Sequence, residues 1–228
     1  MRKAMPVLFN QENRGESMSF NMFMSGVGGQ GLILITSVIG NACARSGKKA
    51  LTGEMHGLSQ RSGTVFVHMR IGEDVFSPLI PYGKADILVG LEAIETLRYI
   101  EYLKKGGTIL MNSRIMHPPV ETHRILRQKD TKYITIEEIL SKLQQWTQNI
   151  AVIDALKLAK DSGNVSTENT VFLGALSTLE EFPVEEEHLR ESISEAVPKK
   201  TIEQNLMAFG LGKKTAFDLL CNLVSCRR

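Results

Sequence analysis

Hydrophobic and polar positions follow two alternating patterns along the first half of the chain. Short apolar runs typical of strands alternate with longer segments that carry apolar residues at helical spacing. The expected strands lie at residues 19–25, 48–53, 85–90 and 108–112. The expected helices run from the glycine-rich stretch after residue 25 to Gly47, and over 92–104, ending before Gly106. This order predicts βαβ units and a mostly parallel sheet.

One segment departs from the pattern of buried strands. Residues 64–71 (TVFVHMRI) alternate apolar and polar side chains, as half-exposed strands do. Such alternation is typical of antiparallel strands with one solvated face. We therefore expect an antiparallel strand here, at the edge of the sheet.

The second half of the chain is increasingly helical. A polar helix is expected around residues 137–147 and a strand near 150–153, and from about residue 155 the pattern is almost entirely helical. We expect residues 19–228 to form a single α/β domain with an α-helical C-terminal extension from about 155. Residues 1–18 are expected to be a disordered leader; alternatively, residues 1–17 precede a true start at Met18.

The first expected strand is followed by the glycine-rich sequence GVGGQG at residues 26–31. It satisfies G-x-G-x-x-G between a strand and a helix, where glycines let a phosphate approach the backbone and the helix N-terminus favours an anion. An acid at the end of the second strand would bind a ribose hydroxyl, and Glu54 has about the spacing of 20 residues that this needs. Gln30 and the extra Gly29 are unusual in a dinucleotide fingerprint. The loop alone therefore leaves nucleotide or other anion binding and a purely structural turn equally open.

A second group of polar and small residues occupies 54–63 (EMHGLSQRSG). Loops at the carboxyl ends of strands gather at one edge of an α/β sheet, so this group is expected beside residues 26–31. His56 has the chemistry of an acid or base, and Arg61 that of a partner for a carboxylate or phosphate. Each residue alone is better explained as part of an ordered polar loop. Together they are expected to form a ligand or subunit contact surface, whose polar members are Glu54, His56, Ser59, Gln60 and Arg61.

Composition narrows the function classes. A net charge of +2 and an aromatic content of 6% argue against nucleic acid and anionic membranes as partners. No apolar run approaches the roughly 20 residues that cross a bilayer. The three cysteines, too few for an iron–sulfur cluster, do not indicate a disulfide framework and fit a reducing cytoplasm. Two interpretations remain for Cys221 and Cys226: a redox role, or packing within a helix. The five histidines have no metal-ligand spacing, so no metal site is expected.

The two loop motifs together resemble a known family. GVGGQG at 26–31 and EMHGLSQRSGTVFVHMRIG at 54–72 resemble the gamma-type domain of 2-oxoacid:ferredoxin oxidoreductases. Within that superfamily the chain is most similar to the small (beta) subunit of indolepyruvate:ferredoxin oxidoreductase. Further similarity lies in ADILVGLEAIETLRYIEYLKKGGTILMNS at 85–113, in Pro118-Pro119 and in NTVFLGAL at 169–176, so that it covers about residues 19–220.

The resemblance implies a Rossmann-like three-layer α/β/α fold and a required subunit without a complete active site. A large (alpha) partner subunit is expected to carry thiamine diphosphate, magnesium and iron–sulfur clusters. The complex would convert an aryl pyruvate and coenzyme A to an arylacetyl-coenzyme A, carbon dioxide and reduced ferredoxin. No catalytic residue is assigned to this chain. Gly26, Gly28, Gly29, Gln30 and Gly31 carry over as the first loop motif, and His56, Gly57, Ser59, Gln60, Arg61 and Gly63 as the second.

Three readings follow from these observations. The first is that the chain is the oxidoreductase subunit and lies in the cytoplasm. In that case the isolated chain either self-associates through the surfaces that bind its partner or stays monomeric. The second is a stand-alone NAD- or FAD-binding protein that uses residues 26–31 and Glu54. The third is an assembly module whose glycine loop is vestigial. Ser62 stands where the family's second motif has its first glycine, so the turn is expected to differ slightly there.

Overall fold

The computed structural model of the protein describes residues 19–57, 63–116 and 133–227. The expected leader, residues 1–18, lies outside this range, as do Ser59, Gln60 and Arg61. The strands are β1 (Phe20–Val27), β2 (Ala50–His56), β3 (Thr64–Ile71), β4 (Ala85–Gly90), β5 (Leu103–Asn112) and β6 (Ile150–Ile153). The α-helices are α1 (Leu32–Arg45), α2 (Ala93–Arg98), α4 (Ile136–Leu143), α5 (Ala155–Asp161), α6 (Glu168–Ser177), α7 (Glu186–Ala196) and α8 (Ile202–Leu220). Short 3-10 helices are η1 (Ile100–Tyr102), η2 (Val165–Thr167) and η3 (Lys199–Thr201).

The six strands form one sheet in the order β2-β3-β1-β4-β5-β6. β1, β4, β5 and β6 are mutually parallel, whereas β3 runs antiparallel to both of its neighbours. The prediction of an antiparallel strand at 64–71 is confirmed, but its placement at the sheet edge is wrong. β2 and β3 are adjacent antiparallel strands, and β3 inserts between β2 and β1, so β2 becomes the edge strand.

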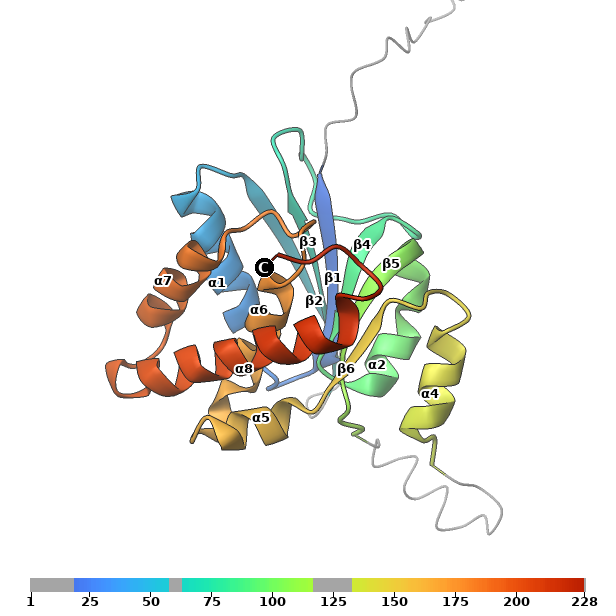
Figure 1. The fold of residues 1–228 in the computed structure, drawn as a ribbon. Coiled ribbons are helices and arrows are strands. Elements are labelled where there is room, and N and C mark those ends of the chain that lie inside the picture. The colour runs from blue at the N-terminus through green and yellow to red at the C-terminus, as the bar shows by residue number, and fades with distance from the viewer. Residues whose placement is uncertain (1–18, 58–62, 117–132, 228) are drawn as a thin grey trace, which may run out of the picture.

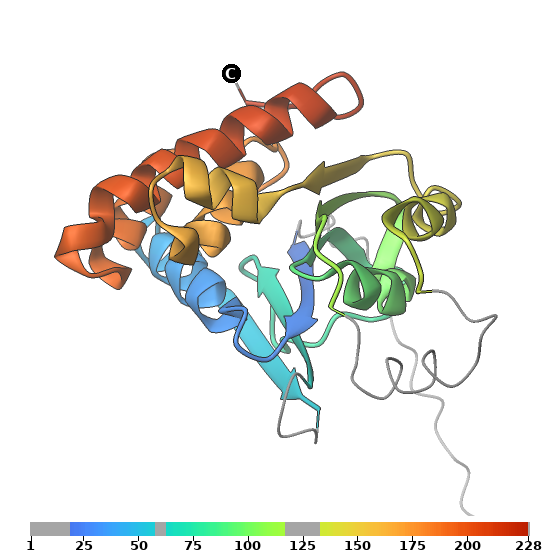
Figure 2. The same cartoon turned by 90° about the horizontal axis from the view of Figure 1, so that it is seen from below.

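Helices cover both faces of the sheet (Figure 1). α1 and α5–α8 lie on one face, where apolar side chains from the strands pack against them in one core. α2 and α4 lie on the other face over a second core, which includes Phe23, Leu88 and Ile109. Figure 2 shows the two helical layers on either side of the strands. The three-layer α/β/α fold is confirmed, and the helices after residue 155 make up most of one layer.

α6 and α8 pack closely enough to exclude side chains at their crossing. A Cβ atom on Gly174 would lie 1.9 Å from the carbonyl oxygen of Phe209, and one on Gly212 would lie 2.0 Å from that of Val171. Neither position tolerates even alanine without movement of the backbone. The small residues in this part of the sequence therefore set the distance between two helices of the same layer.

Two details differ from the sequence prediction. The helix expected over 92–104 stops at Arg98, and Leu103 and Lys104 belong to β5 instead. Gly106 adopts a φ of 74°, which glycine tolerates, so β5 runs through the pair Gly106-Gly107. The sequence pattern predicts instead that this strand starts after the pair. The expectation of no disulfide is also wrong, because Cys221 and Cys226 are bonded where α8 ends, with Cα atoms 5.5 Å apart. Among the described residues, every helix is too short or too polar to span a membrane.

Candidate functional site

The glycine loop connects β1 to α1 at the carboxyl edge of the parallel strands. Gly29 and Gly31 have φ values of 92° and 76°, a left-handed conformation that other residues rarely adopt. Gly31 is the N-cap of α1 and supplies no side-chain cap, and the N–H groups of Leu32 and Ile33 have no acceptor among the described residues. The backbone N–H of Gly29 also has no acceptor within the described part of the chain. The loop therefore presents several N–H donors and the positive end of a helix dipole.

Gln30 holds this loop together from inside. Its Oε1 accepts a hydrogen bond from the backbone N–H of Val27 at 2.8 Å, and its Nε2 donates to the carbonyl of Leu91 at 3.0 Å. A Cβ atom on Gly26 would lie 2.7 Å from Gln30 Oε1. The side chain that is unusual for a dinucleotide fingerprint thus occupies the turn and links it to the end of β4.

The carboxyl ends of β1 and β4 are a topological switch point. The helix after β1 lies on one face of the sheet, and the helix after β4 lies on the opposite face (Figure 2). The two connections diverge there, and open α/β sheets bind ligands in the crevice that this leaves.

A cavity of about 370 Å³ lies at this position. Its walls come from the glycine loop, from the segments that follow β4 and β5, and from the start of α6. The lining residues are Val27, Gly28, Gly29, Gln30, Leu91, Asn112, Arg114, Met116, Val165, Ser166, Glu168, Asn169 and Phe172. Residues distant in the sequence are thus brought to one site.

Three polar side chains give the cavity its chemistry. Asn112 is only 3% exposed, and its side chain makes no hydrogen bond to any part of the chain that the structure describes. The Asn169 side chain lies against Gly31, where a Cβ atom would be 2.1 Å from its Nδ2, and it too has no hydrogen-bond partner among the described residues. Arg114 contributes a cation, 3.5 Å from a carboxylate oxygen of Glu168. Two amides without a partner among the described residues, together with a guanidinium beside Glu168, suit a ligand with anionic and amide groups.

Glu92 positions one wall of the cavity. Its carboxylate, in a residue that is 1% exposed, accepts hydrogen bonds from the N–H groups of Glu95 at 2.7 Å and Met116 at 2.8 Å. The N–H of Ala93 also donates to the carbonyl of Arg114 at 3.0 Å. Burial raises the pKa of the Glu92 carboxyl, and the hydrogen bonds from Met116 and Glu95 oppose this shift. The segment with Arg114 and Met116 is therefore fixed to the start of α2.

The second predicted loop reaches the site at one described point. The N–H of Gly28 donates to the carbonyl of Gly63 at 2.9 Å, so the end of that loop touches the glycine loop. Gly57 lies at the start of the same loop, where its N–H donates to the carbonyl of Thr64 at 2.8 Å. Ser59, Gln60 and Arg61 lie outside the described residues.

The structure does not bring Glu54 and His56 to the glycine loop. Both are exposed on β2, and β3 separates this strand from β1. Glu54 pairs with Val67 of β3, and Val67 pairs in turn with Met24 of β1. One whole strand therefore lies between Glu54 and β1. A ribose-binding acid belongs on the strand beside the first one, and here that neighbour is the antiparallel β3.

Sequence reasoning missed four residues of the site: Glu92, Asn112, Arg114 and Asn169. Asn112 ends a predicted parallel strand, so the rule that places ligands at carboxyl strand ends could have found it. Asn169 belongs to the NTVFLGAL motif, but no spacing in the sequence places that helix start against Gly31. Glu92 looks like an ordinary N-cap until its contact with Met116 is known.

Comparison with known proteins decides the family. A model of the pyruvate ferredoxin/flavodoxin oxidoreductase family matches residues 21–215. The chain belongs to this family. The resemblance inferred from the two loop motifs is thereby confirmed, and with it the expectation of an oxidoreductase subunit.

Relatives within this oxidoreductase family extend over nearly the whole chain. The protein named indolepyruvate oxidoreductase subunit IorB of Thermococcus kodakarensis is 42% identical over 202 residues, which are 88% of this chain and 98% of that protein. The protein of the same name from Pyrococcus horikoshii is 41% identical over 202 residues, with the same coverage. The one from Archaeoglobus fulgidus is 37% identical over 201 residues, 88% of this chain and 97% of that protein.

Solved structures show the same fold at lower identity. The gamma subunit of a keto/oxoacid ferredoxin oxidoreductase from Geobacter sulfurreducens has a TM-score of 0.63 at 24% identity, covering 89% of this chain and 99% of that chain. A 2-oxoglutarate:ferredoxin oxidoreductase from Magnetococcus marinus has a TM-score of 0.66 at 22% identity, covering 90% of this chain and 32% of that chain. The fold of this oxidoreductase subunit therefore also occurs as one part of a longer chain.

Proposed function

We propose that the chain is the small, cluster-free subunit of a hetero-oligomeric 2-oxoacid:ferredoxin oxidoreductase that acts on indolepyruvate or another aryl pyruvate. The complex oxidatively decarboxylates the 2-oxoacid, transfers the acyl group to coenzyme A and passes two electrons to ferredoxin. The observation that carries the proposal is the 42% identity to an indolepyruvate oxidoreductase subunit over 98% of that protein's length.

The cavity at the switch point supports a direct role in ligand binding. The side-chain amides of Asn112 and Asn169 and the N–H of Gly29 have no partner among the described residues. Together with the guanidinium of Arg114 they suit a carboxylate, or a ligand with phosphate and amide groups. Coenzyme A carries phosphates and amides, and the 2-oxoacid carries a carboxylate. In the proposal this cavity forms one wall of the ligand site of the complex, and the loop at 57–63 contributes from the side of Gly28.

The proposed complex takes its cofactors from another chain. Iron–sulfur clusters need about four cysteine thiolates, and here Cys43 is buried while Cys221 and Cys226 are bonded to each other. The described residues also contain no group of three or more His, Cys, Asp and Glu side chains that would hold a metal ion. These residues do not fit a cluster or a magnesium site. Thiamine diphosphate, magnesium and the clusters are therefore assigned to the large partner subunit.

Exposed apolar side chains on β2 and on the segment between β3 and β4 are consistent with association with a larger partner. Phe76 is 84% exposed, and Met55, Leu79 and Tyr82 are also large apolar side chains in contact with solvent. Exposed apolar side chains of this size gather at protein interfaces. The proposal includes a cytoplasmic location, where ferredoxin accepts electrons from the complex.

The two alternative functions have less support. A dinucleotide cradle would need an acid beside β1, whereas Glu54 lies beyond β3 and Gln30 fills the turn. A purely structural loop would not need the amides of Asn112 and Asn169, which line a cavity and have no partner within the described residues. Binding of NAD or FAD by the isolated chain at micromolar affinity would overturn the proposed function.

The test is co-expression with the large subunit, followed by 2-oxoacid- and coenzyme A-dependent reduction of ferredoxin or a dye. We expect turnover with aryl 2-oxoacids. If none of the aryl, branched-chain and simple 2-oxoacids is turned over, the assignment is refuted. Gly28→Asp places a carboxylate in the cavity, where a Cβ atom meets only Gly63 O at 3.8 Å. This variant should lose activity at least about tenfold, as expected when charge repels an anionic ligand.

Gly28→Asn is the matched control, because it adds similar volume without charge. It should retain more activity than Gly28→Asp, and size-exclusion chromatography should show intact complexes for both variants. Full turnover of Gly28→Asp in an intact complex would favour the assembly module instead. If Gly28→Asp instead loses activity, the kinetics of Asn112→Ala identify the ligand of the cavity. The KM of this variant should rise for coenzyme A or for the 2-oxoacid, but not for both.

A further inference from the structure

The last described residues, 221–227, form a strap that crosses the connection between α6 and α7. We call these residues the C-terminal strap. Cys226 bridges Leu179 in an isolated antiparallel pair, and the N–H of Glu180 donates to the carbonyl of Ser225 at 3.2 Å. The N–H of Arg227 donates to the carbonyl of Thr178 at 2.8 Å. The strap is thus held by backbone contacts with the chain that follows α6.

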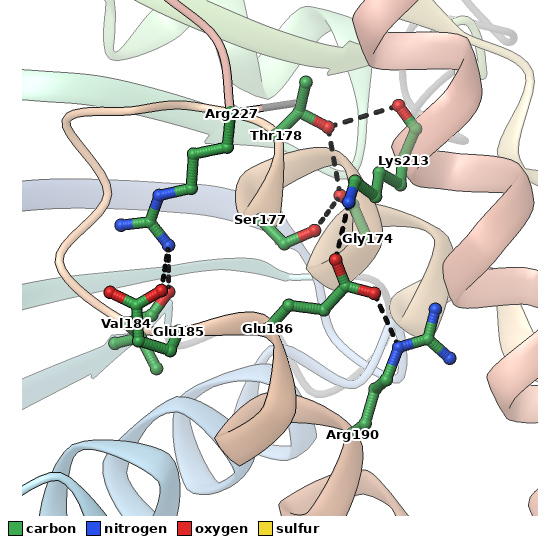
Figure 3. Close-up of polar contacts among 9 residues, drawn as sticks. All are labelled: Gly174, Ser177, Thr178, Val184, Glu185, Glu186, Arg190, Lys213 and Arg227. Carbon is green, nitrogen blue, oxygen red and sulfur yellow. Dashed lines mark hydrogen bonds and ion pairs between the residues drawn. The ribbon is translucent and has the colours of Figure 1, made fainter.

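Arg227 adds the polar anchor of the strap. Its guanidinium donates to the carbonyl oxygen of Val184 at 2.8 Å and lies 3.3 Å from a carboxylate oxygen of Glu185 (Figure 3). It also donates to the carbonyl oxygen of Phe182. The next residue of the same segment, Glu186, pairs with Lys213 of α8 and Arg190 of α7, each at 2.6 Å. The strap therefore fastens a segment that already joins α6, α7 and α8.

The disulfide closes the strap on itself. Cys221 and Cys226 bracket the residues that precede Arg227, and their bond restricts the conformations from which Arg227 reaches its partners. Because the closed ring is short, the loop-closure entropy that it removes from the unfolded chain is small compared with that of long loops. The main effect of the bond is therefore local: it fixes the strap rather than the domain.

The three cysteines differ in how accessible they are to thiol chemistry. Cys43 is buried, and burial raises the pKa of its thiol to about 11, which leaves almost no reactive thiolate. Cys221 and Cys226 are partly exposed and line an open depression with Asn222 and Leu223. Thiol–disulfide exchange requires access to the sulfur atoms, which only this pair offers among the three.

We propose that Cys221 and Cys226 are a reversible thiol–disulfide modification site whose oxidation fixes the C-terminal strap. For oxidation, one thiolate attacks a small-molecule or protein disulfide, forms a mixed disulfide and releases one thiol. The second thiolate then attacks the sulfur of its neighbour, closes the Cys221–Cys226 bond and releases the second thiol. The pair loses two electrons and two protons, and the external disulfide is reduced to two thiols. A dithiol protein of the thioredoxin class reverses the step.

Reduction has two structural consequences. Without the disulfide, residues 221–227 lose more conformational entropy when Arg227 makes its contacts, so the strap detaches more often. Val224 and Ser225 form part of the wall of a cavity of about 360 Å³, opposite Lys104 and Glu181. Detachment of the strap removes this part of the cavity wall and exposes the connection between α6 and α7.

The experiment uses the full-length chain equilibrated at a series of glutathione or dithiothreitol redox ratios and then labelled, without denaturation, by an excess of a maleimide. Intact mass should show two labels appearing together as the buffer becomes reducing, and a third only after denaturation. Hydrogen exchange in residues 178–185 and 221–227 should become roughly tenfold faster on reduction, while β1 and β4 stay unchanged.

Cys221→Ser/Cys226→Ser is the matched variant for the reduced state. Its exchange in the strap should equal that of the reduced protein, with or without reductant. Cys43→Ala should leave the two-label titration unchanged. Full labelling of both cysteines under excess glutathione disulfide would overturn the proposal. So would a bond that resists reduction by thioredoxin in the native protein, or exchange rates that are the same in both redox states.

Discussion

The side-chain Nε2 of Gln30 lies 3.0 Å from the carbonyl oxygen of Leu91, and this hydrogen bond joins the loops that follow β1 and β4. The same side chain accepts from the N–H of Val27, so one residue satisfies backbone groups of two different loops. Those loops form the two sides of the switch point where the cavity lies. The geometry of the candidate site therefore depends on a residue that need not touch a ligand.

Replacement of Gln30 should loosen this junction. Gln30→Ala removes both hydrogen bonds and leaves the N–H of Val27, in a buried residue, without its acceptor. We expect a loss of about 1–3 kcal/mol in the free energy of unfolding, measured by urea denaturation. Gln145→Ala is the control, because Gln145 is exposed and its side chain has no hydrogen bond among the described residues. Equal stability of the two variants would contradict the role given to Gln30.

Gly31 and Gly29 offer a matched comparison within the glycine loop. Both have a positive φ, but a Cβ atom on Gly31 would lie 2.1 Å from Asn169 Nδ2, while one on Gly29 meets nothing within 4 Å. Gly29→Ala should cost about 1–2 kcal/mol from backbone strain. Gly31→Ala should cost about 1–3 kcal/mol more from overlap with the amide. Thermal or chemical unfolding measures both.

A double-mutant cycle separates the two causes. Truncation of the amide in Asn169→Ala removes the overlap, so Gly31→Ala should cost less in that background, by about 0.5–3 kcal/mol. Additive costs would mean that Asn169 moves aside freely and does not pack against Gly31.

The ionisation of Glu92 should make stability depend on pH in a direction opposite to that of a salt-bridged carboxylate. Because burial raises the folded-state pKa above the ordinary value of 4.5, the folded protein binds this proton more tightly than the unfolded chain does. The resulting stability is fully present below about pH 4.5 and is lost as the pH rises through the folded-state pKa.

Glu92→Gln removes this titration. The difference in unfolding free energy, wild type minus variant, should be constant below about pH 4.5 and should fall as the pH rises above it. Urea denaturation at a series of pH values measures the difference. Glu101→Gln, at a more exposed position, is the control for replacing a carboxylate by an amide. A rise in the difference for Glu92→Gln over this pH range would show that hydrogen bonds outweigh burial.

Two glycines of α8 should respond in opposite directions to the same substitution. A Cβ atom on Gly212 would lie 2.0 Å from the carbonyl oxygen of Val171, so Gly212→Ala should cost about 1–3 kcal/mol through separation of α6 from α8. Gly210 lies in open space on the same helix, and Gly210→Ala should stabilise the protein by about 0.5–1 kcal/mol through helix propensity. The sign of each change in melting temperature tests the helix contact directly.

The sequence predicts the fold better than it predicts the site. Apolar runs identify β1, β4, β5 and β6 because parallel strands buried on both faces carry continuous hydrophobic sequence. The position of β3 between β2 and β1 could not be read from its alternating pattern, because alternation reports which face is buried and not which strands are neighbours. Glu54 illustrates the consequence: its spacing from Gly31 fits a ribose-binding acid, but one inserted strand moves it out of reach.

The polar residues of the cavity show the same limit. Asn112 is predictable as the end of a parallel strand, whereas Arg114 and Asn169 meet only through the packing of α6 on the sheet. The hydrogen bond from Gln30 to the carbonyl of Leu91 likewise joins residues that are far apart in sequence. Local pattern contains no information about such pairs.

The antiparallel course of β3 has an evolutionary consequence. The chain between His56 and Thr64 reverses direction beside the glycine loop, and the strands on either side of it pair only with each other and with β1. Insertions, deletions or exchanges of residues in that turn can leave the register of the other parallel strands intact. Selection can thus change the length and composition of the connection whose end contacts Gly28, while the scaffold that carries the cavity stays fixed.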